Sequence, residues 1–395
     1  MTEKLFLEAL DLNAAKLLAD EPTLGTNFPY VTLPSGAWDT LSASHSAGYQ
    51  GANWSHGNWF CGFWVGLLVA AYLRTRNETY LALAKERMLL VAPRANDGNT
   101  HDIGFIFYPS AITLFHVTCD AHYADIAAQA ADRLRRRLIM TPRGSYISAW
   151  GPLDDMRGRR SSAIDTMANL PLLYWAAKYQ DDASFTLAGE AHAMMTRESF
   201  IRPDMSTYHA VEYDIETGER ARGFTFQGYA DSSCWPRGQA WAIYGYTRTA
   251  EATGKRVYLD LAEELSGYFL KRTGPSLVPP WDFDDPAVPN TLLDTAASAI
   301  VASAFADMAA LHPDPKKGEV WGQRARDILA VLCERHLARD EAHRGLLRHG
   351  CYSKPHNQGV DSAVMFGDFF FMEALCSVVM PGGLRSAPKR LASAS

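Results

Sequence analysis

The sequence lacks closely spaced cysteines. Its six cysteines include no C-x-x-C pair and lie far apart along the 395 residues. This spacing argues against a disulfide framework and against a zinc site, so we expect free thiols, no metal, no cofactor and a reducing, cytoplasmic location. The six are Cys61, Cys119, Cys234, Cys333, Cys351 and Cys376.

Long apolar runs and a strong charge of one sign are also missing. No apolar run is long enough to cross a bilayer, and the stretch "MTEKLFLEALDLNAAKLLAD" has neither the basic head nor the apolar core of a signal peptide. The formal net charge is −6, and the basic run at 133–137 is typical of the end of an amphipathic helix. We therefore expect no membrane and no nucleic acid as partners.

Helical patterns fill most of the chain, and two kinds of helix alternate. Helices of the first kind are apolar on all sides and rich in glycine and aromatic residues, which indicates burial. Helices of the second kind follow after a short polar turn and are amphipathic, which indicates one face in water. The first kind comprises "WFCGFWVGLLVAAYL", "IGFIFYPSAITLFHV", "IDTMANLPLLYWAA", "CWPRGQAWAIYGYTR", "LLDTAASAIVASAFADM" and "VDSAVMFGDFFFMEAL". The second kind includes "NETYLALAKERM", "DAHYADIAAQAADRL", "DDASFTLAGEAHAMM", "GKRVYLDLAEELSGYFL" and "GEVWGQRARDILAVL".

This alternation predicts an all-α fold, an (α/α)6 barrel in which each inner helix has an outer one. The helix at Leu5–Leu18 would be the remaining outer helix. Strand signals are few, and "STYHAVEYD" with "GFTFQGYA" predicts a short β-hairpin in a rim loop. We expect residues 1–380 to form a single catalytic barrel domain and the small, polar tail at 381–395 to be disordered.

The predicted connections differ in length at the two ends of the barrel. Those that enter inner helices are much longer than those that leave them, particularly Arg143–Ser162, Pro203–Ser233 and Pro275–Asn290. Because all inner helices run in the same direction, these long loops meet at one rim. Loops carried by a rigid scaffold usually hold binding and catalytic residues, so we expect the site at this rim.

The residues that begin the inner helices are the first candidates. These helices are expected to start near Trp59, Asp102, Asp165, Arg237, Asp294 and Asp361. Aspartate is a preferred helix cap, and capping is the simplest interpretation of Asp294 and Asp361. Asp165 is the one charged residue of a long apolar stretch, where an unpaired carboxylate is costly unless it caps, pairs or takes part in chemistry. For Asp165 and Asp102 the residues alone leave capping and catalysis open.

Other rim residues also have two interpretations. His209 alternates with apolar residues and is either a hydrogen-bonded strand residue or a site residue, and Gln227 either satisfies a loop backbone or binds a ligand. Arg237 follows Pro236 in a first helical turn, where a cation opposes the helix dipole and needs an anion nearby. Aromatic residues either belong to the core or, near the rim, stack on sugar faces; they are Trp59, Trp64, Trp150, Trp241 and Tyr352.

Several long motifs, in order, carry a resemblance to a known family. They are "NWFCGFWVGLL", "THDIGFIFYPS", "SSAIDTMANLPLLYWA", "SCWPRGQAWAIYGY", "PPWDFDDP", "LLDTAASAIVASA" and "HGCYSKPHNQGVDSAVMFGDFFFMEAL". From about Leu18 to Val379 the chain resembles the unsaturated glucuronyl hydrolases, glycoside hydrolase family 88, which fold as (α/α)6 barrels. Ser362–Phe366 departs from the family pattern of an acid and a tryptophan, and we expect this to affect packing or an outer subsite.

The resemblance implies roles for individual residues. The general acid/base aspartate of the family falls on Asp165, and the second essential aspartate falls on Asp102. The implied substrate-binding residues are Trp59, His101, Trp150, His209, Gln227, Arg237, Trp241 and Tyr352. Arg237 would receive the substrate carboxylate.

The resemblance also implies a reaction. Such enzymes act on oligosaccharides left by polysaccharide lyases, whose terminal uronic acid has a C4=C5 double bond. Protonation at C4 and addition of water at C5 would lead to release of the aglycone. Asp165 must then be protonated near neutral pH; burial raises a carboxyl pKa by more than a helix N-terminus lowers it, and Asp102 is expected to be ionised.

Alternatives remain open from the sequence. The unsaturated rhamnogalacturonyl hydrolases share this barrel and chemistry, a sugar 2-epimerase shares the architecture, and a catalytically inactive sugar-binding barrel is a third candidate. Glycosaminoglycan, gellan, xanthan and ulvan fragments all fit as the substrate, and the chain would act as a monomer or homodimer. Ser353 and Lys354 would either meet a sulfate on the aglycone or be solvated loop residues.

Overall fold

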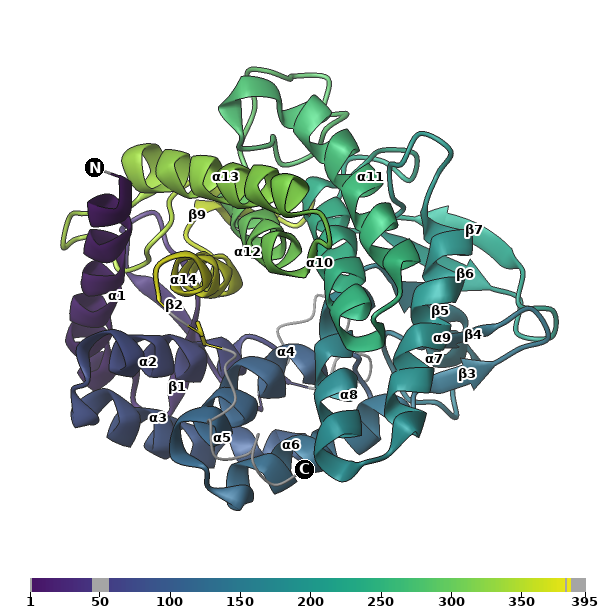
Figure 1. Cartoon of the computed structure of the whole chain (residues 1–395), viewed down its shortest axis with the longest axis horizontal. Coiled ribbons are helices and arrows are strands. Elements are labelled where there is room, and N and C mark those ends of the chain that lie inside the picture. Colours follow the sequence, from purple (N-terminus) through teal and green to yellow (C-terminus); the bar gives the residue numbers. More distant parts are fainter. Residues whose placement is uncertain (1, 45–56, 381, 385–395) are drawn as a thin grey trace.

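The helices of this protein form two concentric rings (Figure 1). The computed structural model describes residues 2–44, 57–380 and 382–384. Within these residues, six inner helices each pack against the next, and the last packs against the first, so the ring is closed. Six outer helices surround it. The (α/α)6 barrel predicted from the sequence is confirmed.

The bounds of the helices follow the predicted alternation. The inner helices are α2 (Cys61–Thr75), the consecutive segments α4 (Ile103–Phe107), η2 (Tyr108–Ile112) and α5 (Thr113–Thr118), then α8 (Thr166–Gln180), α10 (Pro236–Thr253), α12 (Thr295–Leu311) and α14 (Met365–Val379). The outer helices are α1 (Thr2–Leu24), α3 (Glu78–Val91), α6 (Ala121–Arg135), α9 (Ala183–Phe200), α11 (Arg256–Thr273) and α13 (Pro315–Val331). Short helices lie between them: η1 (Ala92–Asn96), α7 (Met156–Arg160), η3 (Gly274–Ser276) and η4 (Leu332–His336).

Glycines on the inner helices allow neighbouring helices to approach closely. A Cβ atom on Gly62 of α2 would lie 2.0 Å from the carbonyl oxygen of Ile106 in α4. A Cβ atom on Gly104 of α4 would lie 2.6 Å from the Cα atom of Asn169 in α8. Neither distance leaves room for a side chain, which explains why the inner helices are rich in glycine.

Side-chain caps are present at the start of several outer helices but not at the start of two inner ones. Four outer helices begin at a residue whose side chain accepts a hydrogen bond from the backbone N–H two positions later; these residues are Asn77, Asp120, Asp182 and Asp314. Asp102 and Asp165 stand at the N-cap positions of α4 and α8, but neither side chain makes a cap hydrogen bond. Capping therefore does not explain these two carboxyls.

The strands are short and lie mainly in the loops that enter inner helices. They are β1 (Asn27–Thr32), β2 (Trp38–Ser42), β3 (Leu138–Met140), β4 (Ser145–Ile147), β5 (Ser161–Ala163), β6 (Ala210–Tyr213), β7 (Arg220–Phe224), β8 (Gly350–Ser353) and β9 (Gln358–Ser362). All pairs are antiparallel. The predicted hairpin is β6–β7, and β5 adds a third strand beside β6, which places the start of α8 against the residue before β6.

Some boundaries differ from the prediction. Asp361 does not begin the last inner helix: it is an exposed residue of β9 with φ of 52°, and α14 begins at Met365. The second hairpin strand lies earlier than expected, and α1 is longer at both ends. The tail predicted to be disordered lies outside the described residues except for 382–384. In the described part of the chain, no helix combines the length and the apolar character that crossing a membrane requires.

Candidate active site

The residues predicted for the site meet at the rim where the inner helices begin. A series of contacts links them. From Asp102 it passes to His101, to Trp150, through Phe226 to His209, and on to Asp165. From Asp165 it continues to Trp241, through Phe105 to Trp59, and then to Tyr352, which contacts both Gln227 and Arg237. Residues as far apart in the sequence as Trp59 and Tyr352 thus form one constellation. Their roles stay predictions, but their proximity is observed.

Asp165 carries a carboxyl oxygen that no described residue satisfies. Its Oδ2 atom is buried and has no hydrogen-bond partner among the described residues. The Nε2 atom of His209 lies 3.8 Å away and also lacks a hydrogen-bond partner there. Unpaired buried polar atoms are costly and rare unless they serve a function. A polar group of a ligand placed between the two side chains would satisfy both.

The Asp165 carboxyl binds a proton more tightly than an ordinary aspartate. Burial, and after it the charge of Asp102, raises its pKa to about 7, while Arg237 and a hydrogen bond from Trp241 act in the opposite direction. The side chain is still 16% exposed, so a ligand can reach it. A carboxyl with this pKa can donate a proton near neutral pH and take one back afterwards.

Asp102 lies on the neighbouring inner helix and is the more acidic of the two. Its Oδ2 atom accepts a hydrogen bond from the Thr100 hydroxyl at 3.0 Å. Burial raises the pKa of Asp102 to about 6, although this hydrogen bond and the charges of two buried arginines oppose the rise. Two interacting carboxyls with different surroundings share protons unequally, so Asp102 carries the charge when Asp165 carries the proton.

His101 is a buried residue whose ring contacts the Asp102 carboxylate. It is 1% exposed, and burial lowers its pKa to about 3, so the ring is neutral. Its Nδ1 atom lies 2.5 Å from the Thr166 hydroxyl oxygen, and its Nε2 atom lies 3.3 Å from Asp102 Oδ1. This geometry suits the tautomer with the proton on Nε2, which then points at the carboxylate and orients it.

His209 is held in one orientation by its neighbours. Its Nδ1 atom lies 2.9 Å from the Thr225 hydroxyl oxygen, and its ring packs between Phe226 and Trp235 at centroid distances of 4.1 and 4.3 Å. Burial holds the pKa of His209 well below its usual range. The ring is therefore neutral and can exchange a hydrogen bond with a ligand through Nε2.

The anion that Arg237 requires comes from the protein itself. Arg237 lies in the first turn of α10, as expected, and its Nη1 atom donates to Asp294 Oδ2 at 2.6 Å and to the carbonyl of Cys351 at 2.6 Å. Its Nη2 atom donates to the carbonyl of Tyr352. Asp294, interpreted from the sequence as a helix cap, stands at the N-cap position of α12 but pairs with this arginine. A substrate carboxylate would have to use other N–H groups of Arg237.

Aromatic rings surround these polar groups. Trp59 lies two residues before α2 and stacks on Phe366 at a centroid distance of 5.3 Å. Trp241 is 1% exposed and lies 4.9 Å from Phe105. Trp150 is half-buried, in an isolated β-bridge with Thr100. Burial of aromatic surface around a carboxyl lowers the local dielectric constant, which favours the protonated form.

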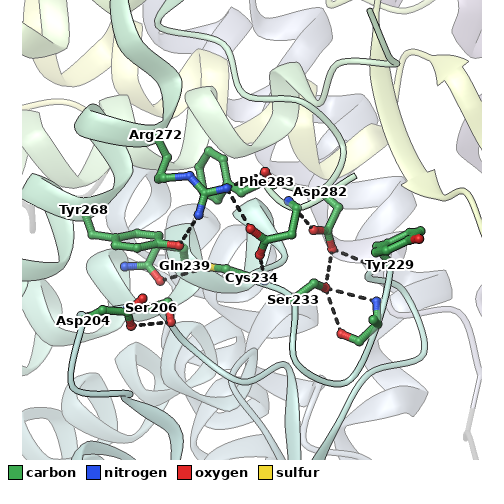
Figure 2. A network of polar contacts seen from close by, with 12 residues as sticks. Asp204, Ser206, Tyr229, Ser233, Cys234, Gln239, Tyr268, Arg272, Asp282 and Phe283 are labelled. Atoms are coloured by element: carbon green, nitrogen blue, oxygen red, sulfur yellow. Dashed lines mark hydrogen bonds and ion pairs between the residues drawn. The ribbon is translucent and has the colours of Figure 1, made fainter. Parts of the chain in front are cut away.

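Gln227 is kept near Tyr352 by a network that joins two rim loops. The side-chain amide of Gln227 donates to the carbonyl of Tyr352 at 3.1 Å. Close by, Asp282 Oδ2 accepts hydrogen bonds from the hydroxyl of Ser233 and the backbone N–H of Tyr229, both at 2.8 Å (Figure 2). The loop at 201–235 is therefore tied to the loop at 274–294, and the position of Gln227 follows from both.

Several residues of the constellation were not predicted. Asn169, one helical turn after Asp165, accepts a hydrogen bond from the backbone N–H of Phe105 at 2.7 Å and donates to the carbonyl of Asp165 at 3.1 Å. It thereby ties α4 to α8. A lone asparagine in an apolar stretch was the available signal, because a buried amide needs partners. Thr166 and Phe226 had no such signal.

The outer candidates Ser353 and Lys354 have partners of their own. Ser353 is buried in β8 and its hydroxyl lies 2.8 Å from His356 Nδ1. The Nζ atom of Lys354 donates to Asp285 at 3.1 Å and lies 4.6 Å from the ring centroid of Trp281. Neither is simply a solvated loop residue, and the charge of Lys354 is balanced within the protein.

Comparisons with curated proteins identify close relatives, whereas a scan against protein-family models found no match. The chain is 34% identical over 328 residues to an unsaturated glucuronyl hydrolase of Bacillus sp. (strain GL1), covering 80% of this chain and 85% of the relative. It is 31% identical over 325 residues to an unsaturated chondroitin disaccharide hydrolase of Streptococcus pneumoniae, covering 80% of this chain and 81% of that protein.

Solved structures agree with these relatives. A crystal structure of the unsaturated glucuronyl hydrolase from Bacillus sp. GL1, described as responsible for the degradation of glycosaminoglycan, matches with a TM-score of 0.86 at 30% identity, covering 96% of this chain and 97% of that one. A variant structure with dGlcA-Glc-Rha-Glc matches with a TM-score of 0.85 at 30% identity, covering 94% and 96%. Sequence and fold thus agree along nearly the whole chain, which belongs to the family of unsaturated glucuronyl hydrolases, a family of glycoside hydrolases.

Proposed function

We propose that this enzyme removes a 4,5-unsaturated uronic acid from the non-reducing end of oligosaccharides produced by polysaccharide lyases. Family membership supports the substrate class, since relatives are named for unsaturated glucuronyl groups and for an unsaturated chondroitin disaccharide. Unsaturated glycosaminoglycan disaccharides are therefore the first substrates to test, with gellan, xanthan and ulvan fragments beside them. Unsaturated rhamnogalacturonyl disaccharides serve as the comparison.

One observation carries the assignment of the proton donor. The Oδ2 atom of Asp165 is buried without a hydrogen-bond partner in the part of the chain that the structure describes, and it faces His209 Nε2 at 3.8 Å. It belongs to a carboxyl whose pKa burial raises to about 7. Asp165 makes no cap hydrogen bond, and the ring that its Oδ2 atom faces, His209, is neutral and forms no structural ion pair with it. Both features are what a general acid needs near neutral pH.

The reaction begins at the vinyl ether of the unsaturated sugar. The Asp165 carboxyl donates its proton to C4, and the positive charge that develops is shared by C5 and the ring oxygen. Water then adds to C5 and gives a proton to the Asp165 carboxylate, which regenerates the acid. The resulting hemiketal opens by breaking the bond between C5 and the ring oxygen. C1 becomes a hemiacetal that expels the aglycone as an alcohol, so one water molecule is consumed.

The other residues bind and orient the sugar. Ionised Asp102, held by His101, accepts hydrogen bonds from sugar hydroxyls and stabilises the positive charge that develops at C5. His209 and Gln227 contribute neutral hydrogen-bonding groups. The remaining N–H groups of Arg237 receive the uronate carboxylate.

Aromatic side chains provide the apolar contacts of the sugar in this proposal. Trp59, Trp150, Trp241 and Tyr352 lie around the two carboxyls, and the half-buried Trp59 and Trp150 have exposed ring surface. Residues 1–380 act as one catalytic domain, as a monomer or homodimer, and no cofactor is needed because the steps above transfer only protons and water. The six unpaired cysteines support a cytoplasmic location.

Isotopic labelling tests the proposed reaction directly. Turnover of an unsaturated disaccharide in heavy water should place deuterium at C4 of the released acid, and labelled water should place its oxygen at C5. Loss of the ultraviolet absorbance of the double bond gives the rate. Oxygen label at C1 alone would mean ordinary glycosidic hydrolysis and would exclude the hydration route.

A further inference from the structure

Arg137 lies beneath the candidate site although its sequence context indicated the surface. It follows α6, at the end of the basic run 133–137 that was interpreted as the exposed end of an amphipathic helix. Its neighbour Arg136 fits that interpretation, with a side chain 66% exposed and paired with Asp132 at 2.7 Å. Arg137 does not, because it is 0% exposed. A buried guanidinium needs a reason, since the cost of removing it from water is large.

All five N–H groups of Arg137 are used, and all go to uncharged oxygens of two segments. The Nε atom donates to the carbonyl of Ser148 at 2.8 Å, and Nη2 donates to the Ser148 hydroxyl at 2.9 Å and to the carbonyl of Gly151 at 3.2 Å. The Nη1 atom donates to the carbonyls of Gly98 and Gly151. Gly98 lies four positions before Asp102 in the sequence.

These two segments carry residues of the site. Asn99 accepts a hydrogen bond from the N–H of Gly151 at 2.9 Å, and the N–H of His101 donates to the carbonyl of Ala149 at 2.8 Å. Thr100 and Trp150 form a bridge between these bonds. Arg137 therefore holds together the two paired segments, 98–101 and 148–151, that position Asp102 and Trp150.

The charge of Arg137 is not neutralised by any of its bonded partners. Burial lowers its pKa to about 9, so the guanidinium stays charged at neutral pH, and the carboxylate whose charge opposes this lowering is Asp102. In turn, the charge of Arg137 lowers the pKa of Asp102 and also that of His101. A second arginine, Arg94, lowers the pKa of Asp102 more than Arg137 does, and it is paired with Asp97.

The other charged or titratable groups around the two carboxyls are either neutral or paired, so they do not cancel the effect of Arg137 on Asp102. His101 faces Asp102 and is neutral, and Asp165 faces it from α8. Near Asp165, His209 is neutral and Arg237 is paired with Asp294. Arg137 is thus a buried cation that bonds the segment leading to Asp102, and its hydrogen bonds to uncharged oxygens leave its charge unneutralised.

We infer that Arg137 is a positioning residue for the reaction: its bonds hold the segments that present Asp102 and Trp150, and its charge keeps Asp102 ionised while Asp165 holds the proton. This inference rests on the proposed function, which assigns opposite protonation states to the two carboxyls. Arg137 does not touch the substrate and acts through Asp102.

The test compares the pH dependence of kcat/KM in variants that change the charge or only the shape. Arg137→Gln removes the charge, and Arg137→Lys keeps a charge but loses the planar fork. Replacement of Arg137 by citrulline, through nonsense suppression, keeps the shape and most N–H groups without the charge, which guards against misfolding of the glutamine variant. Arg136→Gln is the matched control, because it removes one positive charge from the adjacent, exposed position.

The neutral variants should shift the acid limb of the pH profile. Without the cation, Asp102 takes up a proton at higher pH, so the acid limb should move up by about half a unit to one unit, the scale of one partly screened charge. Activity at pH 5.5 relative to pH 7 should then fall roughly threefold. Arg137→Lys should lose rate at all pH values with the acid limb nearly in place, and Arg136→Gln should match the wild type.

Each outcome of this experiment either supports or overturns the role inferred for Arg137. If the folded glutamine or citrulline variant loses rate but keeps the acid limb of the wild type, Arg137 is structural only and the inference is wrong. An equal shift in Arg136→Gln would also overturn it, because any nearby charge would then suffice. Absence of turnover by the wild-type enzyme on unsaturated disaccharides would instead contradict the proposed function, and that result is seen before any variant is compared.

Discussion

Asp165 and Asp102 are the same residue type in similar places, yet their surroundings give them different pKa values. Both stand at the start of an inner helix, and both are half-buried and do not cap it. Asp165 faces a neutral histidine and aromatic rings, whereas Asp102 lies near a hydroxyl donor and two arginines. The two arginines favour the charged form of Asp102, whereas at Asp165 burial and the charge of Asp102 outweigh the charge of Arg237 and favour the neutral form.

The first prediction concerns Asp165→Asn. Asparagine keeps the size of the side chain but cannot donate and regain a proton, so kcat should fall by at least about a hundredfold, the usual scale of acid–base catalysis. The measurement is turnover of an unsaturated disaccharide at pH 6.5. Near-normal turnover by the folded variant would remove Asp165 from the mechanism.

Thermal unfolding provides the control for that variant. Because burial raises the folded-state pKa of Asp165 to about 7, above its ordinary value, ionising the group costs stability as pH rises towards and through 7. Asparagine has no such cost. The unfolding temperature of Asp165→Asn relative to the wild type should therefore increase from pH 5 to pH 8, and a constant difference would show that the pKa is ordinary.

The second prediction concerns the buried pair of Arg237 and Asp294. Arg237→Ala leaves the Asp294 carboxylate buried without its partner, which typically costs about 3–5 kcal/mol of stability. The double change Arg237→Ala with Asp294→Asn should recover part of that loss, measured by denaturant unfolding. In the double variant KM for the disaccharide separates the roles: a KM like that of the wild type would show that Arg237 does not bind the uronate carboxylate.

At the scale of elements, the contact between α4 and α8 sets the distance between the two carboxyls. The helices approach closely at Gly104, and Asn169 bridges them. Each helix begins at one of the aspartates. Any change that separates the helices therefore also changes the geometry of the site.

The third prediction tests this coupling with Gly104→Ala. The added Cβ would lie 2.6 Å from the Cα of Asn169, so the helices must move apart, and both kcat/KM and the unfolding temperature should fall. The matched control is Gly267→Ala on the outer helix α11, where nothing lies within 4 Å of the added Cβ. That variant should keep its activity and gain about 0.5–1 kcal/mol of stability. Equal effects of the two changes would refute the coupling.

At the scale of the whole molecule, the barrel brings six helix starts to one rim, and the proposed chemistry at this rim depends on pH. The proposed mechanism needs Asp102 ionised and Asp165 protonated. Their pKa values of about 6 and about 7 lie in the order that populates this form near neutral pH. The two carboxyls interact, so the titration belongs to the pair.

The fourth prediction is the resulting bell-shaped profile. kcat/KM should rise with pH as the pair loses its first proton near pH 6 and fall as it loses the second near pH 7. The measurement is kcat/KM between pH 4.5 and 9 at constant ionic strength. A rate that stays flat from neutral to alkaline pH would contradict a protonated Asp165 as the donor.

Much of this protein could be predicted from its sequence alone. The alternation of wholly apolar and amphipathic helices determined the barrel, because burial of each helix is recorded in its own residues. The unequal loop lengths indicated the rim that carries the site. The carboxyl of Asp165 stood out because a charged residue in an apolar stretch demands an explanation. The aromatic and polar candidates did come together at that rim.

Only the tertiary structure decided which partner each charge has. Asp294 pairs with Arg237 across 57 positions, Arg137 is buried beneath the site beside an exposed Arg136, and Asp361 lies in a strand instead of capping a helix. Local pattern reports whether a residue suits a helix or a surface, but the protonation state and burial of an ionisable group depend on atoms that are distant in sequence and close in space. Those distances exist only once the barrel is closed.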